Sequence, residues 1–186
     1  MNIIAIDPGK SSLGYCVKEG NEYISGSIVA KDKDTDNIIF ARITKQLKIL
    51  KDKYNIRIVF HEDYAYKKFG KSRSGTHMAE ILGAIKSAFS DEYQEIIFIP
   101  VNSASWKAYF YELKLPENKT KKYKRIVEEN FKREFKTCDE ADAFMIMAAL
   151  IYISRGMVRT DGQMKIKNAV KTAIKNIKEK DNAINN

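Results

Sequence analysis

Apolar residues recur along the chain with two spacings, one typical of strands and one typical of helices. Short runs rich in β-branched and aromatic residues predict strands, whereas apolar residues repeated every three or four positions predict amphipathic helices. The predicted strands are residues 2–6, 13–18, 22–30, 56–61 and 95–99. The predicted helices are residues 37–54, 76–89, 103–113, 121–135, 139–154 and about 163–180. Three strands followed by alternating helices and strands form a mixed α/β order.

This order predicts a mixed five-stranded sheet flanked by helices. The turn at Glu19-Gly20-Asn21 favours an antiparallel meander for the first three strands. The later strands follow helices, so parallel pairing through right-handed crossovers is expected for them. We expect one α/β domain over residues 1–156, followed by a basic helical extension over residues 157–186.

The composition is that of a globular protein with its own apolar core. The chain has 186 residues, of which 44% are hydrophobic, and a domain of this length needs neither disulfides nor a structural metal to fold. Cys16 and Cys138 are too few for a disulfide framework, which favours a reducing compartment. We predict no membrane span, because no apolar run approaches about 18 residues, and the first residues lack signal-peptide features. A cytoplasmic location is therefore expected.

The charge of the chain favours a polyanionic partner. The net charge is +9 and the pI is near 9.4, and lysines and arginines that neutralise phosphates release condensed counterions. Charge alone does not separate nucleic-acid-binding proteins from other basic proteins.

Two predicted strands end in an acidic residue. Asp7 follows the first strand and precedes Pro8-Gly9, and Glu62 follows the fourth strand. Taken singly, Asp7 can be a turn residue and Glu62 an exposed strand end. If the two strands are parallel neighbours, both carboxylates emerge at the edge where open α/β sheets bind ligands.

A second acidic pair opens the helix predicted from residue 139. Thr137 and Glu140 match a capping box. Asp139 can complement the helix dipole, but Asp142 lies on the apolar stripe one turn later. Burial of an uncompensated carboxylate costs several kcal/mol, so this pair indicates a metal site.

The four acidic residues favour hard, oxygen-seeking cations. Since no cysteine or histidine stands at ligand spacing with them, Mg²⁺ or Mn²⁺ fits better than Zn²⁺. Two such ions about 4 Å apart can support phosphodiester hydrolysis.

Four segments, in order, resemble motifs of the RuvC family of Holliday-junction resolvases. They are Ile3–Gly9 with Gly14, Ile58–Glu62, Met78–Ala84 and Asp139–Ala143, and the resemblance spans about residues 2–155. It implies an RNase H-like fold and a RuvC-like nuclease domain over residues 1–156. It further implies that Asp7, Glu62, Asp139 and Asp142 are catalytic and ligate two Mg²⁺ ions. A homodimer would then cut four-way and other branched DNA at paired positions. The Lys-, Asn- and Ile-rich composition resembles bacteriophage members of the family.

Basic and aromatic residues surround these motifs. Aromatic and basic side chains alternate after Glu62, as expected for a segment that stacks on bases and binds phosphates; a solvated loop is the alternative. The resemblance places Lys107 and one of Lys119, Lys121 or Lys122 near the scissile phosphate; a charged helix face is the alternative. The predicted DNA contacts are Tyr64, Tyr66, Lys67, Lys68, Phe69, Lys71, Arg73, Lys107, Lys119, Lys121 and Lys122.

Two other functions stay open from the sequence. One is an RNase H-like nuclease acting on a different nucleic acid. The other is a non-catalytic junction-binding protein, against which the four carboxylates argue, because binding gains nothing from acidic groups beside phosphate. An actin-like ATPase would be about twice as long and would need further phosphate loops.

Overall fold

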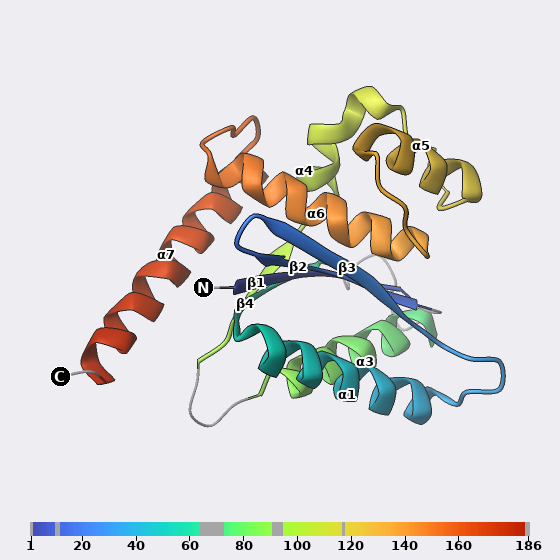
Figure 1. Ribbon diagram of the computed structural model, residues 1–186, viewed down its shortest axis with the longest axis horizontal. Coiled ribbons are helices and arrows are strands. Elements are labelled where there is room, and N and C mark those ends of the chain that lie inside the picture. Colours follow the sequence, from blue (N-terminus) through green and yellow to red (C-terminus); the bar gives the residue numbers. More distant parts are fainter. Residues whose placement is uncertain (1, 10–11, 64–72, 91–94, 117, 185–186) are drawn as a thin grey trace.

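The computed structural model describes residues 2–9, 12–63, 73–90, 95–116 and 118–184. The five strands form a mixed sheet in the order β3-β2-β1-β4-β5, with helices packed on both faces (Figure 1). β1 pairs antiparallel with β2 and parallel with β4, which confirms the predicted meander and the mixed five-stranded sheet. The strands are β1 (Asn2–Pro8), β2 (Ser12–Glu19), β3 (Glu22–Val29), β4 (Ile56–Glu62) and β5 (Ile97–Val101).

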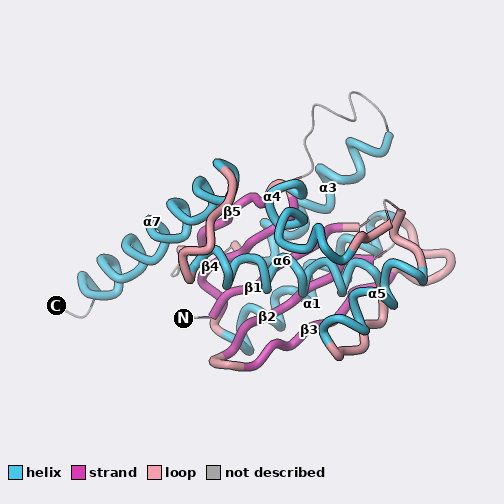
Figure 2. Tube along the Cα trace, turned by 90° about the horizontal axis from the view of Figure 1, so that it is seen from above, coloured by secondary structure: helices cyan, strands magenta, loops and turns pink. Residues whose placement is uncertain are grey.

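The helices form two layers around the sheet. One layer consists of α1 and α3, and the other contains α4, α5 and α6 (Figure 1). Viewed from above, α6 crosses the central strands (Figure 2), and it packs on β1, β2 and β3. The helices are α1 (Asp36–Tyr54), α3 (Arg73–Ala88), α4 (Ser103–Lys107), the 3₁₀ helix η1 (Ala108–Leu113), α5 (Lys121–Phe131), α6 (Cys138–Ser154) and α7 (Asp161–Ile184).

Strand alternation divides the core into two clusters. On β1, Ile4 and Ile6 pack with α1 and α3, whereas Ala5 packs beneath α6. This is the alternation expected of a strand covered on both faces. On β4, Ile58 and Phe60 belong to the cluster under α6, whereas Ile56, two positions before Ile58, belongs to the opposite cluster. A register shift between β1 and β4 near Ile56 explains the difference.

α6 approaches the sheet closely at its N-terminal end. A Cβ atom at Gly14 would lie 1.9 Å from the carbonyl oxygen of Asp139, so only glycine fits at this point of β2. The Thr137 hydroxyl accepts the Glu140 backbone N–H at 3.1 Å, as the predicted N-cap requires. The second half of the predicted capping box does not form, because the Glu140 carboxylate accepts the Ser25 hydroxyl at 2.8 Å and the Lys136 N–H at 2.9 Å.

Three predicted element ends were wrong. β5 continues through Pro100 instead of stopping before it; β5 lies at the end of the strand order, where proline is tolerated. The helix predicted over 103–113 changes to 3₁₀ geometry after Lys107, with non-helical backbone at Phe110. The helix predicted to reach residue 135 ends at Phe131, followed by Lys132 in the left-handed conformation.

α7 shares the hydrophobic core of the preceding residues. Ile166, Ala173 and Ile177 are buried in the same cluster as the inner face of α6. Gln163 is fully buried, and its side-chain nitrogen donates to the Ser105 carbonyl at 3.0 Å. The start of α7 is thereby fixed to α4. Neither α7 nor any other described helix combines the length and the apolar content needed to cross a membrane.

Candidate active site

The parallel pairing of β1 and β4 brings two carboxylates to one edge of the sheet. Ile6 pairs with His61, so the residues that follow, Asp7 and Glu62, lie side by side at the carboxyl ends of their strands. Asp7 is fully buried and Glu62 is 6% exposed. The predicted meeting of these two acids is confirmed.

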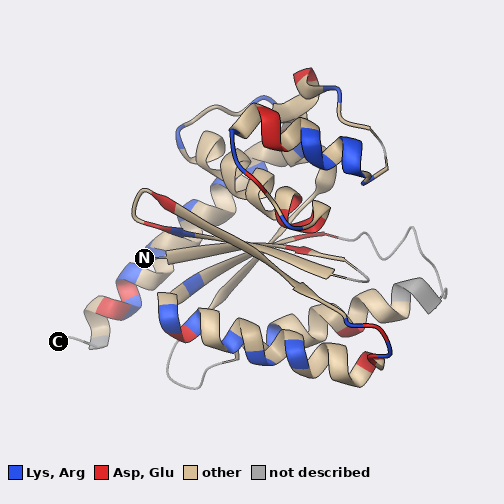
Figure 3. Ribbon diagram, turned by 45° about the vertical axis from the view of Figure 1, so that its right-hand side comes forward, with Lys and Arg blue, Asp and Glu red and all other residues tan. Residues whose placement is uncertain are grey.

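The first two turns of α6 add the other two predicted acids. Asp142 is fully buried, and Asp7, Glu62 and Asp142 each offer a carboxylate oxygen within 4.8 Å of the others. Asp139 lies one turn earlier, at the mouth of the site, with 14% of its side chain exposed. Figure 3 shows acidic segments of the strand ends beneath the start of α6.

Among the described residues, one lysine lies between these carboxylates. Lys119 precedes α5, and its Nζ lies 2.5 Å from Asp7 Oδ2, 2.8 Å from Asp142 Oδ2 and 2.9 Å from Asp139 Oδ1. Its side chain is 32% exposed, so the ammonium is close to solvent. Of the lysines that the sequence placed near the scissile phosphate, Lys119 is the one that reaches the acidic cluster.

Burial raises the pKa of two of the carboxyl groups, because the charged form of a carboxyl group is less well solvated inside the protein. Desolvation raises the pKa of Asp7 well above its ordinary value; Lys119 opposes the shift, and Glu62 adds to it. The pKa of Asp142 is raised to about 6, again mainly by burial, with Lys119 acting in the opposite direction. The Lys119 ammonium alone therefore does not compensate the negative charge that these carboxylates would carry if all were ionised.

Among the described residues, two hydroxyl groups donate to the two aspartates of α6. Ser12 Oγ donates to Asp139 Oδ2, and the Tyr123 hydroxyl donates to Asp142 Oδ1. Burial and the neighbouring Asp142 raise the pKa of Tyr123, so it stays a donor. The sequence carried no signal for either contact, since a serine in a strand and a tyrosine in an amphipathic helix are ordinary residues.

The cluster fits a divalent cation of the Mg²⁺ or Mn²⁺ type. Its candidate ligands are all carboxylate oxygens, which these ions prefer. Asp142 Oδ2 is buried and has no hydrogen bond from the described residues; it has only the nearby Lys119 ammonium. A bound cation would compensate this oxygen and would replace the protons that burial favours on Asp7 and Asp142.

The other predicted DNA contacts do not join this cluster in the described part of the chain. Lys107 is exposed, and its ammonium lies 5.0 Å from the centre of the Trp106 ring. Lys121 and Lys122 are exposed in the first turn of α5. The predicted contacts Tyr64, Tyr66, Lys67, Lys68, Phe69 and Lys71 lie outside the described residues, as does the side chain of Arg73.

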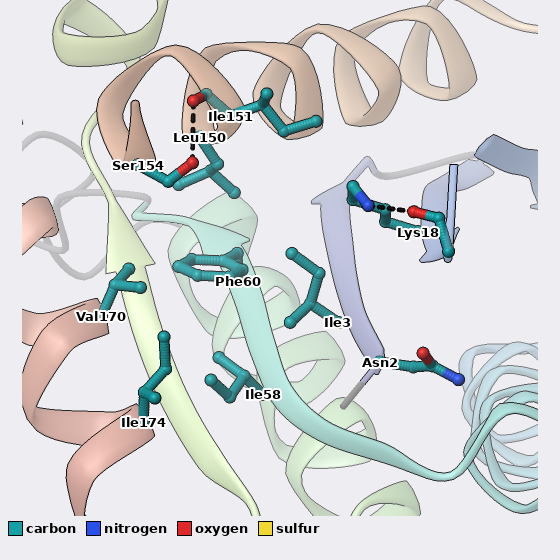
Figure 4. Close-up of a pocket in the computed structure, with 11 residues that line it drawn as sticks. Asn2, Ile3, Lys18, Ile58, Phe60, Leu150, Ile151, Ser154, Val170 and Ile174 are labelled. Atoms are coloured by element: carbon teal, nitrogen blue, oxygen red, sulfur yellow. Dashed lines mark hydrogen bonds between the residues drawn. The ribbon is translucent and has the colours of Figure 1, made fainter. Parts of the chain in front are cut away.

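A pocket of about 350 Å³ lies at the other end of β1 and is separate from the acidic site. Figure 4 shows Ile3, Ile58 and Phe60 of the strands facing this pocket, with Val170 and Ile174 of α7. None of the described residues that line it is acidic. The pocket therefore offers apolar surface but none of the chemistry gathered at the carboxyl ends of the strands.

Comparison with known proteins identifies the fold. No protein-family model and no curated protein sequence matches this chain. RuvC of Thermus thermophilus, solved in complex with a Holliday junction substrate, is similar with a TM-score of 0.63 and 15% identity, over 86% of this chain and 98% of that chain. Another structure of T. thermophilus RuvC gives a TM-score of 0.58 and 15% identity, over 86% of this chain and 99% of that chain. The yeast mitochondrial Holliday junction resolvase Ydc2 gives a TM-score of 0.51 and 12% identity, over 93% of this chain and 83% of that chain. The chain has the RNase H-like α/β fold of the RuvC and Ydc2 resolvases.

Proposed function

We propose that this chain is a divalent-cation-dependent DNA endonuclease that resolves Holliday junctions and related branched DNA. The observation that carries the proposal is the convergence of Asp7, Glu62 and Asp142, with Asp139 beside them, at the carboxyl ends of β1 and β4. This cluster lies in a fold shared with two Holliday junction resolvases. A protein that only binds DNA gains nothing from buried carboxylates near a phosphate, because the charges repel.

The four carboxylates would hold two Mg²⁺ ions, and Mn²⁺ can substitute because it accepts the same oxygen ligands. Bound there, the cations would supply the positive charge that stabilises the phosphate as water attacks it. Asp7, Glu62 and Asp142 would act as ligands from the buried floor of the site, and Asp139 from its mouth.

Lys119 would act on the DNA side of the site. Hydrolysis adds water to phosphorus and breaks the bond to the 3′ oxygen, which leaves a 5′-phosphate and a 3′-hydroxyl. The departing oxygen needs a proton or a positive charge beside it. The partly exposed ammonium of Lys119, within ion-pair distance of three of the carboxylates, can provide either.

Charge and symmetry support the proposed substrate and assembly. The net charge of +9 favours DNA phosphates as partners. A four-way junction presents two equivalent strands, so a homodimer with one site per chain would make the paired cuts that resolution requires. Such a protein would act in the cytoplasm; a bacteriophage origin stays a prediction from composition.

Cleavage of defined substrates tests this proposal. The purified chain is incubated with labelled four-way, Y-shaped and linear duplex DNA, in Mg²⁺ or in EDTA. We expect Mg²⁺-dependent nicks at symmetric positions of the four-way junction and little cutting of the linear duplex. Equal cutting of linear DNA or of an RNA–DNA hybrid would favour the alternative nuclease. Tight junction binding without cutting in Mg²⁺ or Mn²⁺ would favour the non-catalytic alternative.

A further inference from the structure

Each of the two aspartates of α6 accepts a hydroxyl group on one carboxylate oxygen and faces Lys119 with the other. Ser12 of β2 donates to Asp139 Oδ2, while Asp139 Oδ1 lies 2.9 Å from Lys119 Nζ. Tyr123 of α5 donates to Asp142 Oδ1, while Asp142 Oδ2 lies 2.8 Å from the same nitrogen. The two carboxylates therefore share one arrangement, although their hydroxyl donors come from different elements.

Both donors are held in place by their own surroundings. Tyr123 is 3% exposed, and its ring lies in the core cluster that includes the inner face of α6. Its position on α5 is fixed by Thr120, whose hydroxyl accepts the Tyr123 N–H as the N-cap of that helix. Ser12 is 8% exposed and begins β2, where it pairs with Val29. Both hydroxyl groups are therefore carried by buried side chains.

A carboxylate on a short side chain can rotate about its last bond, which exchanges its two oxygens. A hydroxyl fixed on one oxygen opposes this rotation and leaves the other oxygen for the cation, as second partners of metal ligands do. We propose that Ser12 and Tyr123 are positioning residues that hold Asp139 Oδ1 and Asp142 Oδ2 toward the divalent cation. This inference rests on the proposed cation-dependent function and adds the groups that orient its ligands.

Cation binding by hydroxyl-deletion variants tests the inference. Tyr123→Phe keeps the buried ring and removes the hydroxyl, and Ser12→Ala removes the other donor. The dissociation constant for Mn²⁺ is measured from the electron paramagnetic resonance of the unbound ion, and unfolding temperatures are measured in EDTA. We expect each variant to raise the dissociation constant by about 10- to 100-fold. Ser12→Thr keeps a hydroxyl and is expected to bind within about three-fold of the parent chain.

Tyr109→Phe is the matched control. The Tyr109 hydroxyl donates to the Met157 carbonyl and has no hydrogen bond to the acidic cluster among the described residues, so its loss should leave Mn²⁺ binding unchanged. Unchanged Mn²⁺ binding by Tyr123→Phe and Ser12→Ala would overturn the positioning role and leave the proposed function standing, even if their unfolding temperatures fall. Absence of Mn²⁺ binding by the parent chain would overturn both. If Tyr123→Phe does not fold, the contrast between Ser12→Ala and Ser12→Thr decides the matter.

Discussion

Burial of Asp142 at the start of α6 makes its carboxyl group sensitive to pH when no cation is bound. Its pKa in the folded chain is about 6, above the ordinary value of 3.8. A group with a raised folded pKa contributes stability below its unfolded pKa, and this contribution is lost as the pH rises through the folded pKa. The cation-free protein should therefore lose stability between about pH 4 and pH 6 through this residue.

Asp142→Asn should remove this pH-dependent loss. At pH 7.5 in EDTA we expect the variant to be more stable than the parent chain by about 1–3 kcal/mol. The difference should disappear near pH 4, where the aspartate is protonated. Urea denaturation at the two pH values measures the effect.

Added Mg²⁺ supplies the control for Asp142→Asn. Saturating Mg²⁺ should stabilise the parent chain, because a ligand that binds only the folded state raises its stability, and should stabilise Asp142→Asn much less. A parent chain that is more stable than Asp142→Asn at pH 7.5 in EDTA would contradict the proposed charge excess.

At the residue scale, the acidic ligands could be predicted and their supporting hydroxyls could not. Asp7 and Glu62 end apolar strands, and Asp142 stands on an apolar helix stripe, so each leaves a local pattern in the sequence. Ser12 lies 127 positions from Asp139 in the chain, and no periodicity connects the two. Such contacts depend on how β2, α5 and α6 pack, which local pattern does not specify.

At the element scale, α6 can lie this close to β2 because position 14 of β2 is a glycine and has no side chain. Gly14→Ala would place a Cβ against the backbone of the first turn of α6, which cannot move without shifting Asp139. We expect a loss of stability of about 3 kcal/mol or more, together with weaker Mg²⁺ binding. Thermal denaturation and cation titration of the purified variant measure the two effects.

Gly83→Ala is the natural comparison for Gly14→Ala. Gly83 lies in α3, and a Cβ there would meet nothing within 4 Å. Since alanine favours helices, this variant should be more stable than the parent chain by about 0.5–1 kcal/mol. If the two alanine variants change stability in the same direction, close approach of α6 to β2 is not what requires glycine at position 14.

The order and type of the elements could be predicted better than their ends. The period of apolar residues identified the strands and most of the helices, because each has one or two buried faces. The end of β5 beyond Pro100 depends on its place in the sheet order. The early end of α5 accompanies a tertiary contact, in which the Glu128 side chain accepts the Phe135 N–H at 2.9 Å.

At the scale of the whole molecule, the positive charge predicts salt-sensitive junction binding. Raising the salt concentration from 50 to 200 mM should weaken junction affinity by at least about 100-fold if several lysines neutralise phosphates. Lys121→Gln with Lys122→Gln should weaken binding and reduce the salt slope by about one for each lost contact. Fluorescence anisotropy with a labelled four-way junction measures both quantities.

Lysines on the opposite layer serve as the control for this prediction. Lys45 and Lys48 are exposed on α1, which covers the face of the sheet away from α6. Lys45→Gln with Lys48→Gln makes the same change in net charge, and it should leave the salt slope nearly unaltered. Equal effects of the two double substitutions would show that junction binding depends on the total charge and not on the position of the lysines.

Replacement of one buried ligand tests the central claim most directly. Asp7→Asn preserves the size of the side chain, removes one candidate ligand and lessens repulsion of phosphate. Single-turnover cleavage of a four-way junction in Mg²⁺ should fall by at least about 1,000-fold, the scale of one essential group at a catalytic centre, while junction affinity in EDTA stays within a few fold. Cleavage by Asp7→Asn at the rate of the parent chain would contradict the account.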